Sequence, residues 1–352
     1  MIIRIIIDSM ADKATTRLTQ RDIARLAKVS QTTVSLVLNN RSDATARIPA
    51  ETRDRVLKVI RETGYQADPL ARRMLEQRNQ ILGVFTYESV FPSASGDFYH
   101  PFLAGIEDSA ERIGCDLLLF TSAPVTSGRR RIFHDNNRLR IADGCLLLGR
   151  RIPADELARL IAEEYPFVSV GRRDDAGGPV PYVGADYAGA TSTVVERAFA
   201  LGHRRIAFVG PGTGAESSAD RLLGFRRTAG NRAPQLPTAD RPPAEVLDDL
   251  LGRRITTAFV EERADAIALT DAAAERGVDI PADLSVVALG DSTRPAASGL
   301  DFSGFHVPRQ EMGRQATELL EAILSDRAAA GTQRLLPCEL AEGTTLIAPK
   351  GS

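Results

Sequence analysis

Residues 18–40 read LTQRDIARLAKVSQTTVSLVLNN and contain two short amphipathic segments in close succession. Apolar residues of this stretch recur in two groups on either side of the polar letters KVSQ: Ile23, Leu26 and Ala27, then Val34, Val37 and Leu38. This spacing predicts helices over residues 22–27 and 31–38 that pack against each other through the apolar positions. The second helix would leave Gln, Thr and Ser side chains exposed, as a helix that enters the major groove of DNA requires.

A third helix is predicted after IPAETRD, where Pro49 and an acidic first turn mark its start and Gly64 marks its end. We therefore predict a helix-turn-helix DNA-binding domain over residues 17–64, followed by a hinge or linker helix over residues 65–78. The alternatives are a three-helix packing module without a ligand and a plain interdomain linker. The charge distribution favours the DNA-binding interpretation.

The net charge of the chain is −2, but its distribution along the sequence is uneven. Residues 17–78 contain 13 Lys and Arg against 7 Asp and Glu, which gives this segment a net charge of +6. Residues 1–16 are neutral, so the chain from residue 79 onward carries −8. A basic segment joined to an acidic body is expected when only one end of a protein meets a polyanion such as DNA.

From Ile81 onward, short apolar runs such as ILGVF, DGCLLLG and LSVVALG alternate with helical stretches. Continuous apolar strands separated by helices predict parallel sheets that are covered on both faces. The runs are too numerous for one compact sheet of this type. We therefore predict an α/β core made of two Rossmann-like subdomains.

Motifs for catalysis or metal binding are absent from the sequence. There is no G-x-S-x-G and no H-E-x-x-H, and the four His residues lie far apart in the sequence without metal-ligand spacing. The glycines at 210, 212 and 214 follow a predicted strand, but their G-x-G-x-G spacing differs from that of a dinucleotide-binding loop. We therefore predict no cofactor, no metal site and no enzymatic activity.

The cysteines and the first residues of the chain indicate where the protein acts. Cys115, Cys145 and Cys338 are isolated in or beside apolar segments, as expected of reduced thiols in a cytoplasmic protein. The opening MIIRIIIDSM is apolar but short and has no small-residue cleavage site, so it is a poor signal peptide. We expect residues 1–16 to be a disordered leader, and no apolar run is long enough to span a membrane.

The order and spacing of three segments carry a family resemblance. DIARLAKVSQTTVSLVLN, IPAETRDRVLKVIRETGY and DPLARRM lie between Leu18 and Arg73, and this region resembles the DNA-binding headpiece and hinge of the LacI/GalR family of bacterial repressors. The remainder, to about residue 349, resembles the effector-binding core of that family, which is similar to periplasmic sugar-binding proteins.

The resemblance implies a specific domain organisation. An all-α helix-turn-helix headpiece with a hinge helix would precede an α/β core of the periplasmic-binding-protein type I-like fold over residues 79–349. The N-subdomain would comprise residues from about 79 to 184 and from 305 to 334. The C-subdomain would comprise residues from about 185 to 304 and from 335 to 349.

The resemblance also implies the residues that contact DNA. Base contacts fall on Gln31, Thr32 and Leu36, the last a departure from the Arg that many relatives carry. Phosphate contacts fall on Thr19, Ser30, Thr33, Asn39, Thr52 and Tyr65. In the hinge, the residues that meet the minor groove fall on Leu70, Ala71 and Met74, with Met74 in place of the usual Leu wedge.

For the effector, the resemblance implies a cleft between the two subdomains at the carboxyl ends of the strands. The predicted effector-binding residues are Arg221, Glu262, Asp291, Phe98, Tyr99 and His306. Two acids of the family appear here as Gly171 and Gly290. Their loss argues against a simple hexose, and Glu262 and Asp291 could instead supply acceptors for a sugar or select an amino- or polyol-type ligand.

The function implied is that of a sequence-specific transcriptional regulator, by default a repressor. Two protomers would form a homodimer on the double-stranded DNA of a pseudo-palindromic operator, and a sugar or related metabolite would control operator affinity. A solute-binding protein of a transporter is the second hypothesis, but it predicts a secretory signal and no basic headpiece. An enzyme built on the Rossmann-like sheets is the third, and it lacks a catalytic motif.

Overall fold

The computed structural model describes residues 18–38, 48–63, 65, 79–88, 96–126, 129–135, 137–293 and 298–350. Its chain divides into two compact units, residues 1–79 and 80–352. The predicted leader and almost all of the predicted hinge lie outside the described residues. Within the described part of the chain, no helix combines the length and the apolar character that a membrane span requires.

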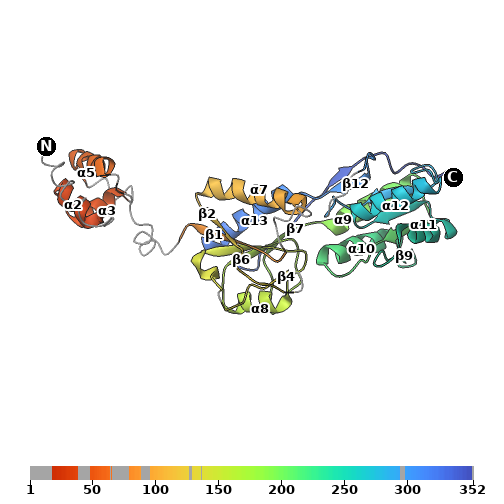
Figure 1. The fold of residues 1–352 in the computed structure, drawn as a ribbon, viewed down its shortest axis with the longest axis horizontal. Helices are drawn as coiled ribbons and strands as arrows, with labels where there is room; N and C mark the ends of the chain where they lie inside the picture. Colours follow the sequence, from red (N-terminus) through yellow and green to blue (C-terminus); the bar gives the residue numbers. More distant parts are fainter. Residues whose placement is uncertain are drawn as a thin grey trace. The chain divides into compact units, whose positions relative to one another are not determined.

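The first unit contains the three predicted helices, which are α2 (Gln20–Ala27), α3 (Gln31–Leu38) and α5 (Ala50–Thr63) (Figure 1). Helix α2 begins two residues earlier than predicted because Thr19 and Asp22 form a reciprocal capping box at its start. Lys28 ends α2 in the left-handed conformation, with φ of 54°. The helices enclose a small apolar core: Ile23, Ala24, Ala27, Val34, Val37, Val56, Val59 and Tyr65.

The second unit contains two six-stranded sheets. All strands of the first sheet are parallel and follow the order β13-β7-β6-β5-β1-β2. Its strands are β1 (Ile81–Thr86), β2 (Asp116–Phe120), β5 (Gly144–Leu148), β6 (Phe167–Val170), β7 (Tyr182–Ala185) and β13 (Gln333–Leu336). A short antiparallel pair, β3 (Val125–Thr126) and β4 (Arg129–Arg130), lies between β2 and the 3-10 helix η1 (Leu139–Ile141) along the chain.

The second sheet has the order β14-β12-β11-β10-β8-β9, and only β14 runs antiparallel to its neighbour. Its strands are β8 (Ile206–Val209), β9 (Gln235–Leu236), β10 (Thr257–Val260), β11 (Ser285–Ala288), β12 (Ser303–His306) and β14 (Glu339–Ala341). The helices of this unit are α7 (Gly96–Ile113), α8 (Ala154–Ala162), α9 (Tyr187–Ala200), α10 (Glu216–Ala229), α11 (Pro243–Gly252), α12 (Arg263–Glu275) and α13 (Arg309–Leu324).

Helices cover both faces of each sheet, as the continuous apolar strands predicted (Figure 1). In the first sheet, Leu82 and Val84 of β1 face the core beneath α7 and α13, whereas Phe85 faces the core beneath α8. In the second sheet, Phe208 packs towards α9 and α10, and Val209 packs towards α11 and α12. This alternation along single strands produces a separate apolar layer on each face.

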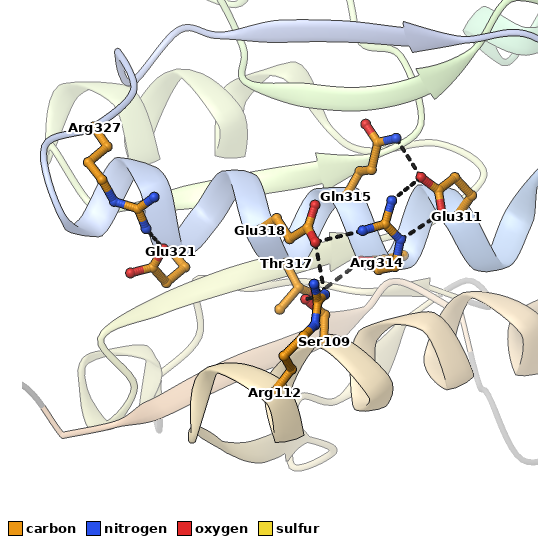
Figure 2. Close-up of polar contacts among 10 residues, drawn as sticks. Ser109, Arg112, Glu311, Arg314, Gln315, Thr317, Glu318, Glu321 and Arg327 are labelled. Atoms are coloured by element: carbon orange, nitrogen blue, oxygen red, sulfur yellow. Dashed lines mark hydrogen bonds and ion pairs between the residues drawn. The ribbon is translucent and has the colours of Figure 1, made fainter.

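Helices α7 and α13 pack closely because each contributes a glycine to the contact. A Cβ atom at Gly105 would lie 1.9 Å from the carbonyl oxygen of Gln310, and one at Gly313 would lie 2.2 Å from that of Phe102. Figure 2 shows the polar network on this helix pair, in which Glu318 of α13 accepts from Arg112 of α7 at 2.8 Å. The other polar contacts of α13 in this view involve Glu311, Arg314, Gln315, Glu321 and Arg327.

The chain passes between the two sheets at three places within the described residues, after β7, after β12 and after β13. The strands end at residues 185, 306 and 336, and the subdomain boundaries were predicted at about 184, 304 and 334. The sheets share a continuous core, which joins Val84 of one to Phe208 of the other.

Candidate DNA-binding surface and effector cleft

The start of α3 presents polar side chains to solvent. Gln31 and Thr32 are exposed, whereas Val34 and Val37 on the opposite side of the helix are buried in the headpiece core. Leu36, the third residue predicted to contact bases, is half-buried. The apolar contact therefore fixes α3 in the domain and leaves an amide and a hydroxyl available for base edges.

Two residues that were predicted to contact phosphates, Ser30 and Thr33, lie at the start of α3. The Ser30 hydroxyl accepts from the backbone amide of Thr33 at 3.1 Å, and the two hydroxyls lie 2.8 Å apart. Thr19 caps α2 and donates its hydroxyl to Asp22 at 2.7 Å. This hydrogen bond is the main cause that lowers the pKa of Asp22. Hydroxyls at helix starts lie where the helix dipole favours anions such as DNA phosphates.

The remaining headpiece predictions lie in different environments. Thr52 is half-buried in the first turn of α5, and Tyr65 is buried in the headpiece core, with 8% of its surface exposed. Arg55 of α5 donates to the carbonyl oxygen of Ala27 at 3.0 Å and so fixes α5 against the end of α2. The residues that lie outside the described part of the chain are Asn39, Leu70, Ala71 and Met74.

A cleft lies between the two sheets of the second unit, where their parallel strands end. Gly149 follows β5, Gly171 follows β6, Glu261 follows β10 and Val307 follows β12, and all four line the cleft. Its volume is about 780 Å³, including the part that opens to solvent. Ligands of open α/β sheets bind in this position because chain reversals at the strand ends leave a crevice.

Arg221 of α10 is buried in this cleft, with 7% of its surface exposed. Its Nε donates to the carbonyl oxygen of Leu289 at 2.6 Å, and its Nη1 donates to that of Ser217 at 2.9 Å. The guanidinium lies over the Tyr187 ring at 3.9 Å from the ring centroid. Backbone acceptors and an aromatic ring therefore fix its orientation before any ligand binds.

The two predicted carboxylates, Glu262 and Asp291, also line the cleft. Glu262 accepts from the amide of Thr293 at 2.9 Å and from its hydroxyl at 2.6 Å. Asp291 accepts from the amide of Val307 at 2.9 Å, and its other oxygen lies 2.8 Å from Nδ1 of His306. Both carboxylates therefore hold segments of the cleft wall together.

Phe98 lines the cleft, but Tyr99 and His306 are not among its lining residues. Tyr99 is buried with 3% of its surface exposed, donates its hydroxyl to Glu88, and has a pKa raised mainly by burial. The His306 side chain is 53% exposed and contacts Asp291 from outside the cleft. Adjacent helical residues point in different directions, and of this pair only Phe98 lines the cleft.

Three arginines that line the cleft, Arg150, Arg172 and Arg173, were not predicted as cleft residues. Arg172 and Arg173 follow β6, and Arg150 follows β5, beside Arg151. Arg172 contacts Asp220 of α10 at 2.7 Å, and Arg173 contacts Glu216 of α10 at 3.1 Å. Both ion pairs join the half built on the first sheet to the half built on the second. The sequence signal was an Arg-Arg dipeptide directly after an apolar strand, in LLLGRR and again in VSVGRR.

Comparison with known proteins assigns both units. Residues 19–68 match the model of the bacterial regulatory proteins of the lacI family, and residues 195–346 match that of the periplasmic binding protein-like domain. Catabolite control protein A of Staphylococcus xylosus is 25% identical over 92% of this chain and 98% of its own length. The HTH-type transcriptional repressor CytR of Escherichia coli K12 is 26% identical over 96% of this chain and 99% of its own.

The fold also matches solved structures. The lac repressor dimer bound to operator and the anti-inducer ONPF has a TM-score of 0.71 at 20% identity, covering 95% of this chain and 100% of that one. These matches define a DNA-binding transcriptional regulator with a LacI-type helix-turn-helix domain and a periplasmic-binding-protein-like domain. The chain belongs to the LacI/GalR family, whose members are regulators rather than enzymes, and the predicted fold class is confirmed.

Proposed function

We propose that this regulator is a repressor that binds a pseudo-palindromic operator as a homodimer and whose operator affinity is set by a small metabolite in the cleft. It acts on DNA in the cytoplasm. The observation that carries the DNA-binding part is the exposure of Gln31 and Thr32 at the start of α3 while Val34 and Val37 are buried. A recognition helix has this arrangement, because the buried face positions the helix and the exposed face reads bases.

The cleft supports the effector part of the proposal. It is lined by residues of both sheets, so a ligand there contacts both halves and favours one of their relative arrangements over another. The half built on the first sheet begins at β1, which follows the hinge directly in sequence. A change in this half can therefore be passed to the hinge, and a homodimer would place two headpieces on two half-sites.

The DNA-binding part is tested with an operator selected in vitro from random duplexes. Gln31→Ala and Thr32→Ala should each weaken binding to the selected operator by about 1–3 kcal/mol, or roughly 5- to 150-fold, because each removes a base contact. Binding to random DNA should change little, since phosphate contacts dominate it. Fluorescence anisotropy measures both, and Glu62→Ala, an exposed residue of α5, is the control. Equal losses on operator and random DNA would refute the base-reading role.

The effector part is tested with Arg221→Ala. This variant should bind the operator normally but lose its response to a ligand found by thermal-shift screening. A retained response would show that the cleft is not the effector site. Sedimentation of the operator complex separates a dimer on one operator from other stoichiometries.

A further inference from the structure

The cleft contains three buried arginines. Arg173, Arg221 and Arg309 have 5%, 7% and 9% of their surfaces exposed, and all three line the cleft. A charge removed from water is unfavourable unless a group of opposite charge or several hydrogen bonds compensate for it. The partners of these guanidiniums therefore indicate what the cleft is built to bind.

Only Arg173 of these three has a carboxylate partner among the described residues, Glu216 at 3.1 Å. Arg309 donates to the carbonyl oxygens of Asp291 and Ser292 at 3.3 and 3.1 Å, and it lies 4.8 Å from the centroid of the Phe98 ring. Arg221 likewise donates to backbone carbonyl oxygens and lies over Tyr187. Within the described part of the chain, neither Arg221 nor Arg309 forms an ion pair, and backbone carbonyl oxygens hold both guanidiniums instead.

The carboxylates of the cleft are already used by the protein. Glu262 accepts two hydrogen bonds from Thr293, Asp291 accepts from Val307 and contacts His306, and Glu261 accepts from the amide of Gly212 at 2.8 Å. A neutral sugar needs acceptors for its hydroxyl protons. Each of these acids already accepts at least one hydrogen bond from the cleft wall, whereas guanidinium donors face the cleft.

Two glycines lie beside these guanidiniums. A Cβ atom at Gly290 would lie 3.1 Å from Nη2 of Arg221, and one at Gly171 would lie 3.6 Å from Nη2 of Arg173. Both glycines have positive φ, 125° and 110°. At Gly171, which lines the cleft, the nearest atom to the Cβ position lies 3.6 Å away, so the space beside Arg173 is open to a ligand. At Gly290, Val307 also lies 3.4 Å from the Cβ position, so this glycine allows close packing of Arg221.

We infer that the effector is an anionic metabolite whose carboxylate or phosphate group binds Arg221 and Arg309, rather than a neutral sugar. This inference rests on the proposed effector role of the cleft. The first turn of α10 supports it, because Ser217 and Ser218 line the cleft and a helix N-terminus favours an anion. Burial is the main cause that lowers the pKa of Arg309; the charges of Asp291 and Glu262 act in the opposite direction, and the charge of Arg221 acts in the same direction as burial.

The test uses the full-length protein and compounds in matched pairs at constant ionic strength. Thermal unfolding is measured with glucose, gluconate and glucose 6-phosphate, with ribose and ribose 5-phosphate, and with inorganic phosphate alone. At a hundredfold excess over its dissociation constant, an anion should raise the midpoint by about 5–10 °C, and its neutral counterpart should not. Gluconate and glucose 6-phosphate separate the carboxylate source of the charge from the phosphate source.

The variant Arg309→Gln should abolish the anion-dependent rise. Arg204→Gln is the matched control, because Arg204 also lies over an aromatic ring, Phe199, and donates to the backbone carbonyl oxygens of Phe199 and His203, but outside the cleft. Arg309→Lys keeps the positive charge and should keep part of the rise. This variant remains informative if the glutamine variant folds poorly.

Three outcomes would overturn the inference. The first is an equal rise of the unfolding midpoint with a neutral sugar. If Arg221→Ala removed that rise, the cleft would still be the effector site, and only the anionic character of the effector would be refuted. The second is the absence of any rise with every anion, including inorganic phosphate, which would leave operator binding as a separate result. The third is a rise that Arg309→Gln retains, which would place the anion elsewhere on the protein.

Discussion

Replacement of Gly105 by alanine should destabilise the effector-binding core, because α7 and α13 approach backbone to backbone at this residue. The new Cβ would lie 1.9 Å from the carbonyl oxygen of Gln310 and 2.9 Å from the amide nitrogen of Arg314. Carbon and oxygen need about 3.3 Å, so the helices must separate by more than about 1 Å. Such overpacking costs about 3 kcal/mol, and the helix propensity of alanine offsets about 1 kcal/mol of it.

The net loss of about 2 kcal/mol corresponds to a fall of roughly 4–8 °C in the midpoint of thermal unfolding. Gly252→Ala at the end of α11 is the control, since no atom lies within 4 Å of its Cβ position. Ligand affinity should fall as well, because α7 carries Phe98 and α13 carries Arg309. If Gly105→Ala unfolded at the same temperature as the control, the close helix contact would be refuted.

Two further predictions concern buried titratable groups. Burial lowers the pKa of His203 below its ordinary 6.5, so the unfolded chain binds a proton more readily. Stability should therefore be complete above about pH 6.5 and decline as the pH falls below it. The decline of the urea midpoint between about pH 7.5 and 5.5 should be smaller in His203→Gln, and an unchanged decline would assign the effect to other groups. Burial also raises the pKa of Cys145, which is fully buried, so iodoacetamide should modify it only after unfolding. Its modification in the native protein, detected by mass spectrometry, would contradict this burial.

The headpiece was predictable from sequence because local rules determine it. The apolar spacing in residues 18–38 sets both the helices and their contact, and Pro49 and Gly64 delimit the third helix. The left-handed Lys28 was harder to predict, because glycine is the residue usually associated with that conformation.

Strands of the core were predictable only where they are continuously apolar. Strands β5 and β11 lie within the predicted runs DGCLLLG and LSVVALG, and β1 extends the predicted run ILGVF by one residue. Strands β13 and β14 were not predicted, because they lie at sheet edges, where exposed polar residues interrupt the apolar pattern. Their hydrogen-bonding partners are distant in sequence, and a local pattern cannot reveal such pairing.

Cleft residues that lie close behind a predicted strand could be located from the sequence. Residues that a chain reversal brings to the cleft could not. Asp291 lies close behind β11, and the family resemblance led to its prediction as a cleft residue. Arg173 lies near the Cβ position of Gly171 because the backbone turns there with φ of 110°. That turn brings a residue two positions further along the chain back to the cleft, which spacing alone does not indicate.

The ion pairs between the two halves explain how an anion could change the regulator. Arg172–Asp220 and Arg173–Glu216 already join the first-sheet half to α10, the helix that carries Arg221. An anion bound to Arg221 and Arg309 would add a contact between α10 and α13, which packs on the first sheet. The negative charge of the anion would also lie near the carboxylates of α10. Its effect on the two existing ion pairs would depend on the distance between the anion and those carboxylates. Under the proposed function, the sign of the DNA response depends on which arrangement of the two halves these combined contacts favour.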